Sequence, residues 1–236
     1  MKFLIKVIIF LTIQLLDQSA SSEENPQPRP LRINCYVSKL WPAFPYDAVA
    51  QRCTHLTYFF AVIQNGTVAP SSPMDVKPSD GNFAKLMEIK KFNEKIKILL
   101  AIGRWNNHDA MSFSMALRTA PSRQRLAQSI SDFLTDHSLD GVVLNWVDPG
   151  DKFRGAPQDG ANYVEFVKTL RSKVAPSVTL AATGSPFRPN IKLGYQVAQL
   201  ADILDFVEIR TFLFYTGRSV HAGHNSPLRS DENTLR

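Results

Sequence analysis

The stretch LDGVVLNWVDPG, residues 139–150, holds the pattern that decides the fold of this chain. We predict a β-strand here, in which successive side chains point to opposite faces. Val143, Asn145 and Val147 are then expected to share one face. Trp146 is expected to point the other way and to pack beneath helices. A register shift of one residue would exchange the two faces.

Short apolar runs alternate with segments of helical period on both sides of this stretch. The other predicted strands are residues 31–37, 55–63, 96–102, 178–183 and 203–211. The predicted helices are residues 82–91, 123–136, 161–174 and 193–200. This alternation implies an α/β fold with a parallel sheet and right-handed crossovers. Alternation alone does not distinguish an open sheet from a barrel.

The stretch resembles the signature strand of the family 18 glycoside hydrolases, the chitinases and chitinase-like lectins. That pattern is D-G-x-D-x-D-W-E with a proline soon after, and Asp140, Gly141, Trp146 and Pro149 match it. Other segments resemble further family motifs in the same order: NCYVS (34–38), YFFAVI (58–63), ILLAIGRWN (98–106), DFVEIRTFLF (205–214) and GHNSPL (223–228). The resemblance implies an incomplete (β/α)8 TIM-type barrel, with about six βα units over residues 31–236. Ligand sites of such barrels lie at the C-terminal ends of the strands.

The resemblance also implies that catalytic chemistry has been lost, because the family's three acidic positions fall on Val143, Asn145 and Val147. Chitinases of this family use a glutamic acid to protonate the glycosidic oxygen, and the substrate's acetamido group then attacks the anomeric carbon. Valine has no proton to donate and asparagine carries no charge, so we expect a protein that is not an enzyme. Asp148 is expected to be a loop or rim carboxylate, with a relocated acid as the alternative.

Carbohydrate-binding candidates remain at positions that resemble the family's central sugar subsites: Tyr36, Phe60, Gly103 and Trp105. A flat aromatic ring can stack on the C–H face of a sugar and bury apolar area. The alternative is that these rings are ordinary core or rim aromatics. The resemblance implies no cofactor and no metal.

Other residues depart from the family pattern near the expected cleft. Arg104 replaces a glycine, and Phe212 replaces a tyrosine whose hydroxyl supports the reacting acetamido group. Glu208 and Arg210 are two residues apart on the last predicted strand and should face the barrel interior together. We expect them to form an internal ion pair. The alternative is a pocket in which Arg104 and Arg210 bind an anionic ligand.

The first thirty residues are typical of a targeting segment and a linker. Residues 1–20 combine a charged start, an apolar run and small residues, which predicts a signal peptide. The run is short and interrupted, so no membrane span is expected after cleavage, although an uncleaved signal anchor is the alternative. Residues 21–30 form a polar linker. We therefore expect a secreted, extracellular protein.

The two cysteines and one sequon agree with that compartment. Cys35 and Cys53 match the family's pairing of a first-strand cysteine with one just before the second strand, so a disulfide is expected. Two buried free thiols are the alternative. Asn65 begins the glycosylation sequon Asn-Gly-Thr on a turn between apolar runs and should lie at the surface.

Composition is that of an ordinary globular domain, with 44% hydrophobic and 20% charged residues. The formal net charge of +6 comes from scattered basic residues and one short run at 85–97. No nucleic-acid motif accompanies them, so a solvated cationic surface is expected, with weak attraction to anionic glycans or membrane surfaces as an alternative.

The chain ends at Arg236, inside the loop region after the sixth predicted strand, so the family's last two strands have no counterpart. Three explanations stay open: an incomplete gene model, a truncated product that folds poorly, and a genuine short form closed by another chain. The leading functional hypothesis is binding of chitin or other N-acetylglucosamine-containing glycans. The alternatives are a protein-interaction or signalling factor on the same scaffold, and an active chitinase.

Overall fold

The computed structural model describes residues 31–38, 40, 44–104, 106–212, 214–215 and 222–226. The predicted signal peptide and linker, residues 1–30, lie outside this part, and so does Trp105. The chain divides into residues 1–32 and 33–236, and the fold described here is that of the second unit. No helix of the described residues is long and apolar enough to cross a membrane.

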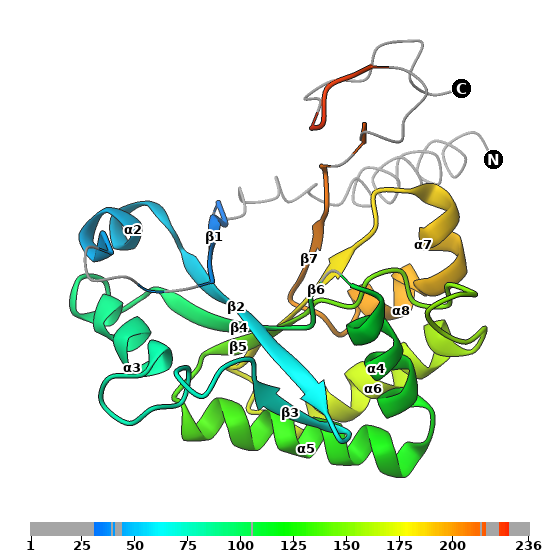
Figure 1. The fold of residues 1–236 in the computed structure, drawn as a ribbon, viewed down its shortest axis with the longest axis horizontal. Helices are drawn as coiled ribbons and strands as arrows, with labels where there is room; N and C mark the ends of the chain where they lie inside the picture. Colours follow the sequence, from blue (N-terminus) through cyan, green and yellow to red (C-terminus); the bar gives the residue numbers. More distant parts are fainter. Residues whose placement is uncertain are drawn as a thin grey trace, which may run out of the picture. The chain divides into compact units, whose positions relative to one another are not determined.

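One sheet organises the unit, as Figure 1 shows. In the described part of the chain, six strands run parallel in the order β1-β2-β4-β5-β6-β7, and β3 pairs antiparallel with β2. The strands are β1 (Asn34–Val37), β2 (His55–Gln64), β3 (Thr67–Pro70), β4 (Lys97–Ile102), β5 (Gly141–Leu144), β6 (Thr179–Gly184) and β7 (Phe206–Ile209). The expected incomplete TIM-type barrel of about six βα units is confirmed.

Helices connect successive strands and cover one face of the sheet. They are α2 (Tyr46–Arg52), α3 (Asn82–Met87), the 3₁₀-helix η1 (Glu88–Lys91), α4 (Asn107–Leu117), α5 (Ala120–Asp136), α6 (Asp159–Lys173), α7 (Arg188–Gly194) and α8 (Val197–Ala201). Helices α5 and α6 lie side by side along the sheet (Figure 1).

Several element boundaries differ from the predictions, and capping explains part of the difference. Helix α5 begins earlier than residue 123 because Thr119 and Ser122 form a reciprocal capping box. Helix α4 was not predicted; the side chain of Asn106 caps it by accepting a hydrogen bond from the Asp109 backbone N–H at 2.9 Å. The single helix predicted at 193–200 is instead two short helices, α7 and α8, separated at Tyr195.

The β2–β3 hairpin interrupts the strict alternation of strands and helices that the sequence predicted. Asn65 and Gly66 form its two-residue turn with φ of 52° and 74°, so both residues have the positive φ that a type I′ turn requires. Gln64 pairs with Thr67 across this turn. Asn65 is exposed, which confirms the surface position predicted for the sequon.

The two faces of the sheet have different neighbours. The outer face packs against the helices in a large apolar core, to which Leu100, Val142 and Leu144 belong. The inner face carries a separate small cluster of Leu99, Ala101, Val143 and Ala181, flanked by partly buried aromatic rings. Alternate residues of β4 and β5 therefore divide between two environments, as strand geometry requires.

Trp146 confirms the register predicted for residues 139–150. Its side chain is 1% exposed on the helix side, stacked on Phe113 of α4 with ring centroids 5.3 Å apart. Tyr163 of α6 meets it edge-on at 5.2 Å. Because Trp146 points outward, Val143 and Asn145 point inward.

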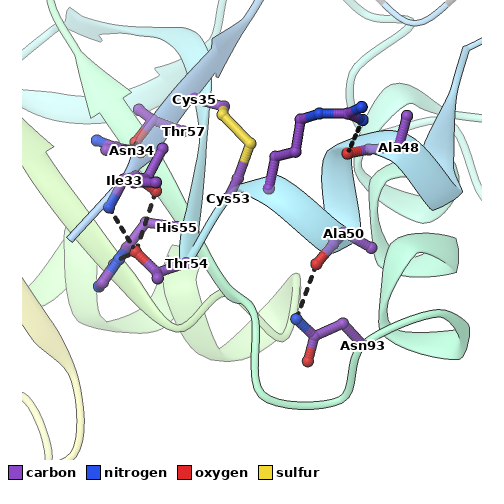
Figure 2. The surroundings of a disulfide bond; sticks show 11 residues. Ile33, Asn34, Cys35, Ala48, Ala50, Cys53, Thr54, His55, Thr57 and Asn93 are labelled. Carbon is purple, nitrogen blue, oxygen red and sulfur yellow. Dashed lines mark hydrogen bonds between the residues drawn. A yellow bond between two sulfur atoms is a disulfide. The ribbon is translucent and has the colours of Figure 1, made fainter. Parts of the chain in front are cut away.

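A disulfide joins Cys35 of β1 to Cys53, which ends α2 just before β2 (Figure 2). The expected pairing is confirmed. Hydrogen bonds between Ile33 and Thr54 lie beside it: the Ile33 N–H donates to the Thr54 hydroxyl, which itself donates to the Ile33 carbonyl. These contacts hold the start of β1 against β2, so the disulfide fixes the strand on which Tyr36 lies.

Candidate functional site

The resemblance places the family's three acidic positions at Val143 of β5 and at Asn145 and Val147, which follow this strand. Val143 is fully buried among Leu99, Ala101 and Ala181 of the neighbouring strands. Val147 is buried as well. Val143 lies on the inner face, and both valine side chains end in methyl groups that can neither donate a proton nor carry a charge.

Asn145 is held by hydrogen bonds on both sides of its amide. Its Nδ2 donates to the Gly103 carbonyl at 2.8 Å, and its Oδ1 accepts from the Thr183 hydroxyl at 2.8 Å. The side chain is 2% exposed. Asn145 therefore links the ends of β4 and β6, and it is not a charged group aimed at a ligand.

Gly103, a predicted sugar contact, is buried at this same junction. It has φ +100°, and a Cβ at this position would lie 2.8 Å from both the Asn145 carbonyl oxygen and the Phe113 ring. Glycine is required here by backbone conformation and by close packing. Gly103 does not line the cavity of about 600 Å³ that opens at the C-terminal ends of the strands.

Asp148 lies in the turn after β5 with φ +49°, which confirms its prediction as a loop carboxylate. Its two oxygens accept hydrogen bonds from Arg210 at 3.3 Å and from Arg154 at 3.4 Å. Arg154 also pairs with Asp151 at 3.2 Å, and this hydrogen bond is the main cause that lowers the pKa of Asp151. Two arginines and two aspartates thus form a charge-balanced cluster.

The predicted ion pair between Glu208 and Arg210 is wrong. Glu208 lies in β7 and Arg210 directly follows this strand, but Arg210 pairs with Asp148. Glu208 instead accepts hydrogen bonds from two neutral groups of β1: Asn34 Nδ2 at 2.6 Å and the hydroxyl of Tyr36. The sheet brings these partners together across its inner face. The sequence did not indicate this contact, because the residues of β1 and β7 are about 170 positions apart in the chain.

The alternative pocket, in which Arg104 and Arg210 bind an anion, is not formed either. Arg104 is bound to Asp109, with its Nε 3.0 Å and its Nη2 3.2 Å from the carboxylate. Burial alone would raise the pKa of Asp109, but these hydrogen bonds and one from the Arg104 backbone lower it. The two arginines therefore have separate aspartate partners.

A cavity of about 600 Å³ opens at the C-terminal ends of β1, β2, β6 and β7. Its lining residues are Tyr36, Val37, Ser38, Phe59, Thr183, Glu208, Ile209, Arg210, Thr211 and Phe212. This is the end of the sheet where ligands bind in barrels of this kind. The cavity combines aromatic rings with one carboxylate, one guanidinium and hydroxyl groups.

Of the predicted carbohydrate contacts that the structure describes, Tyr36 alone lines the cavity. Its side chain is 46% exposed, and its ring meets that of Phe59 edge-on with centroids 6.4 Å apart. Burial, and then the neighbouring Glu208 carboxylate, raise the pKa of the Tyr36 phenol well above its usual value. The phenol therefore keeps its proton, and its O–H donates a hydrogen bond to Glu208.

Phe59 lines the cavity, whereas Phe60 was the ring predicted to do so. The pairing of β2 with β4 shifts between Phe59 and Ala61, so the alternation of faces breaks at Phe60. Phe60 instead carries the guanidinium of Arg104 over its ring at 5.2 Å. Such an irregularity has no signal in an uninterrupted apolar run.

Among the described residues, no group of His, Cys, Asp and Glu could hold a metal ion. The described lining of the cavity offers hydrogen-bonding groups, aromatic faces and the side chains of Glu208 and Arg210.

The sequence profile of the glycosyl hydrolases family 18 matches residues 31–236. The oviduct-specific glycoprotein of Bos taurus is 31% identical over 84% of this chain and 38% of its own length. Chitotriosidase-1 of Mus musculus is 29% identical over 78% of this chain and 40% of its own length. This chain thus spans less than half of the length of either relative.

Solved structures share the fold. A mutant of the Group II chitinase catalytic domain 2 of Ostrinia furnacalis, in complex with a penta-N-acetylated chitooligosaccharide, matches with a TM-score of 0.75 and 22% identity. An immunomodulatory active chitinase of Trichuris suis matches with a TM-score of 0.72 and 24% identity. Each match covers 86% of this chain and 56% of the other.

Proposed function

Because this chain belongs to the glycosyl hydrolase family 18, we propose that it is a secreted carbohydrate-binding protein without hydrolase activity. Its ligands are chitin or other N-acetylglucosamine-containing glycans, bound in the cavity at the ends of β1, β2, β6 and β7. One observation carries this proposal. The described lining of the cavity has aromatic and hydrogen-bonding groups, whereas Val143, Asn145 and Val147 have no acidic side chain.

The absence of hydrolysis follows from the chemistry of these side chains. Glycosidic cleavage needs a general acid that protonates the leaving oxygen, and removal of such an acid costs about 10²–10⁴-fold in rate. Both oxygens of Asp148 accept hydrogen bonds from arginines, Arg154 and Arg210, so this carboxylate is held as an acceptor. Glu208 accepts hydrogen bonds from Asn34 and Tyr36 and is likewise held as an acceptor.

Secretion is supported by the disulfide and by the surface sequon. Disulfides persist in oxidising compartments, and the bond between Cys35 and Cys53 joins residues that lie in the folded core region. The exposed Asn65 is available for a glycan. Both observations agree with the signal peptide predicted at residues 1–20.

Retention on chitin beads tests the binding proposal. The secreted protein is incubated with beads and with soluble N-acetylated oligomers, alongside a Trp105→Ala variant that removes the ring predicted to contact sugar. Phe153→Ala is the matched control, since this aromatic ring is 79% exposed in the loop after β5 and does not line the cavity. We expect Trp105→Ala to lose retention and Phe153→Ala to keep it.

A protein-interaction role is the second candidate, and one contact favours it. The Arg104 guanidinium covers the Phe60 ring, so a sugar cannot stack on that face unless Arg104 moves. If the wild-type protein is retained neither by chitin nor by soluble oligomers, the carbohydrate proposal is wrong and this second candidate takes its place. Turnover of a chitooligosaccharide that disappears in Asp148→Asn would instead show that the protein is an active hydrolase.

A further inference from the structure

Among the described residues that line the cavity, Glu208 is the one carboxylate. Its Oε1 accepts a hydrogen bond from Asn34 Nδ2 at 2.6 Å, and its Oε2 accepts one from the Tyr36 hydroxyl. A carboxylate offers about four acceptor sites, so each oxygen keeps a lone pair for a further donor.

The orientation of these groups is set by a third residue. The Thr57 hydroxyl donates to Asn34 Oδ1 at 2.8 Å, so the NH₂ group of Asn34 is the part that faces Glu208. The raised pKa of Tyr36 keeps the phenol protonated as a donor. Both neighbours therefore donate to Glu208, and neither neutralises its charge.

The nearby arginines do not neutralise Glu208 either. Arg210 pairs with Asp148, and Arg154 pairs with Asp148 and Asp151, so this cluster has two positive and two negative charges. Within the described part of the chain, no Lys, Arg or His nitrogen lies within 4 Å of the Glu208 carboxylate. A half-buried carboxylate without a cation carries a desolvation cost that a bound cation would offset.

Aromatic residues share the cavity with Glu208. Tyr36, Phe59 and Phe212 all line the same cavity. The faces of aromatic rings attract cations, and the attraction grows as the cation is removed from water. A carboxylate among aromatic rings is suited to a protonated amine, whose three N–H groups can use the remaining lone pairs of Glu208.

We propose that this cavity selects a protonated amino sugar, the glucosamine unit of partly deacetylated chitin, over an N-acetylglucosamine unit. This inference rests on the proposed carbohydrate function. The ammonium group binds Glu208, and the sugar ring lies against the aromatic side chains. An acetamido group at the same place has one N–H and no charge, so it satisfies Glu208 less well.

Titration calorimetry with two tetrasaccharides tests this selectivity. Fully deacetylated and fully acetylated chitotetraose are each titrated into the secreted wild-type protein at mildly acidic pH, where the sugar amine carries its proton. We expect the deacetylated oligomer to bind at least about tenfold more tightly, which corresponds to about 1.4 kcal/mol. Added salt should weaken this preference, because ions screen the charge pair.

Glu208→Gln removes the charge and keeps the size of the side chain. We expect this variant to bind both oligomers within about twofold of each other. Glu165→Gln is the matched control, because Glu165 is an exposed residue of α6 paired only with Lys168, and it should keep the full preference. If Glu208→Gln does not fold, the salt series on the wild-type protein tests the same charge pair.

The outcomes separate the two proposals. If the acetylated oligomer binds as tightly as the deacetylated one or more tightly, or if Glu208→Gln keeps the preference, the amino-sugar inference is overturned and the carbohydrate function stands. If neither oligomer binds, the carbohydrate function fails and the inference fails with it. A salt-independent preference also overturns the inference, since it would not come from charge.

Discussion

Removal of the disulfide should lower stability by an amount that the structure allows us to calculate. The bond between Cys35 and Cys53 closes a loop with a sequence separation of 18 residues. Loop-closure entropy for this length is worth about 3 kcal/mol at 25 °C. For a domain of about 200 residues, each kcal/mol shifts Tm by about 2–4 °C, so the expected loss is about 6–12 °C.

The double variant Cys35→Ala/Cys53→Ala is expected to fold, because β1 stays paired with β2 from Asn34 to Val37. Its Tm is measured by circular dichroism beside the oxidised wild-type protein and the fully reduced wild-type protein. The reduced protein and the double variant should melt at the same lowered temperature. Ligand binding should weaken as well, because Tyr36 follows Cys35 directly on β1.

A difference in Tm below about 2 °C between the oxidised protein and the double variant would refute this reasoning, since it is far below the loop-closure value. It would mean that the β1–β2 pairing already restricts the unfolded chain or that the native bond is strained by its surroundings. Intact mass before each melt shows whether the bond is present.

Two further predictions concern the core and the pH dependence. Trp146→Ala should lower the unfolding free energy by about 3–5 kcal/mol in urea titrations, because it leaves a cavity between Phe113 and Tyr163; a loss below 1 kcal/mol would contradict the packing. The pKa of Asp109 is lowered in the folded protein, so its pair with Arg104 stabilises the fold at pH values above the unfolded-state pKa of about 4. This stabilisation is lost as the pH falls through the folded-state pKa. Asp109→Asn should therefore flatten the dependence of Tm on pH below about pH 5, and an unchanged slope would show that the pair contributes nothing.

The alternation within residues 139–150 was predictable because it is a local property of strands. Trp146 packs on the helices and Val143 on the inner face, as the two-residue period requires. The pairing of Cys35 with Cys53 was expected from the family resemblance, and it is present. The β2–β3 turn at Asn65 was also indicated, because Asn-Gly favours positive φ.

Predictions about side-chain partners were less successful because partners depend on distant strands. Glu208 and Arg210 share a face, but proximity along the chain did not pair them, since Asn34, Tyr36 and Asp148 offer better-placed groups across the sheet. Phe59 replaced Phe60 in the cavity because β2 changes register against β4. Both outcomes depend on how distant strands are placed and paired in the sheet, which local sequence patterns do not specify.

The sequence by itself indicated the α/β class and a parallel sheet, because these follow from residue type and from short periods that the local backbone fixes. Its resemblance to the family then predicts that Val143, Asn145 and Val147 stand at the acidic positions. Only the tertiary structure decided that Glu208 lies in an aromatic cavity without a cationic partner among the described residues. That environment forms where β1 and β7, the first and last of the described strands, are joined by the hydrogen bonds of Asn34 and Tyr36 to Glu208.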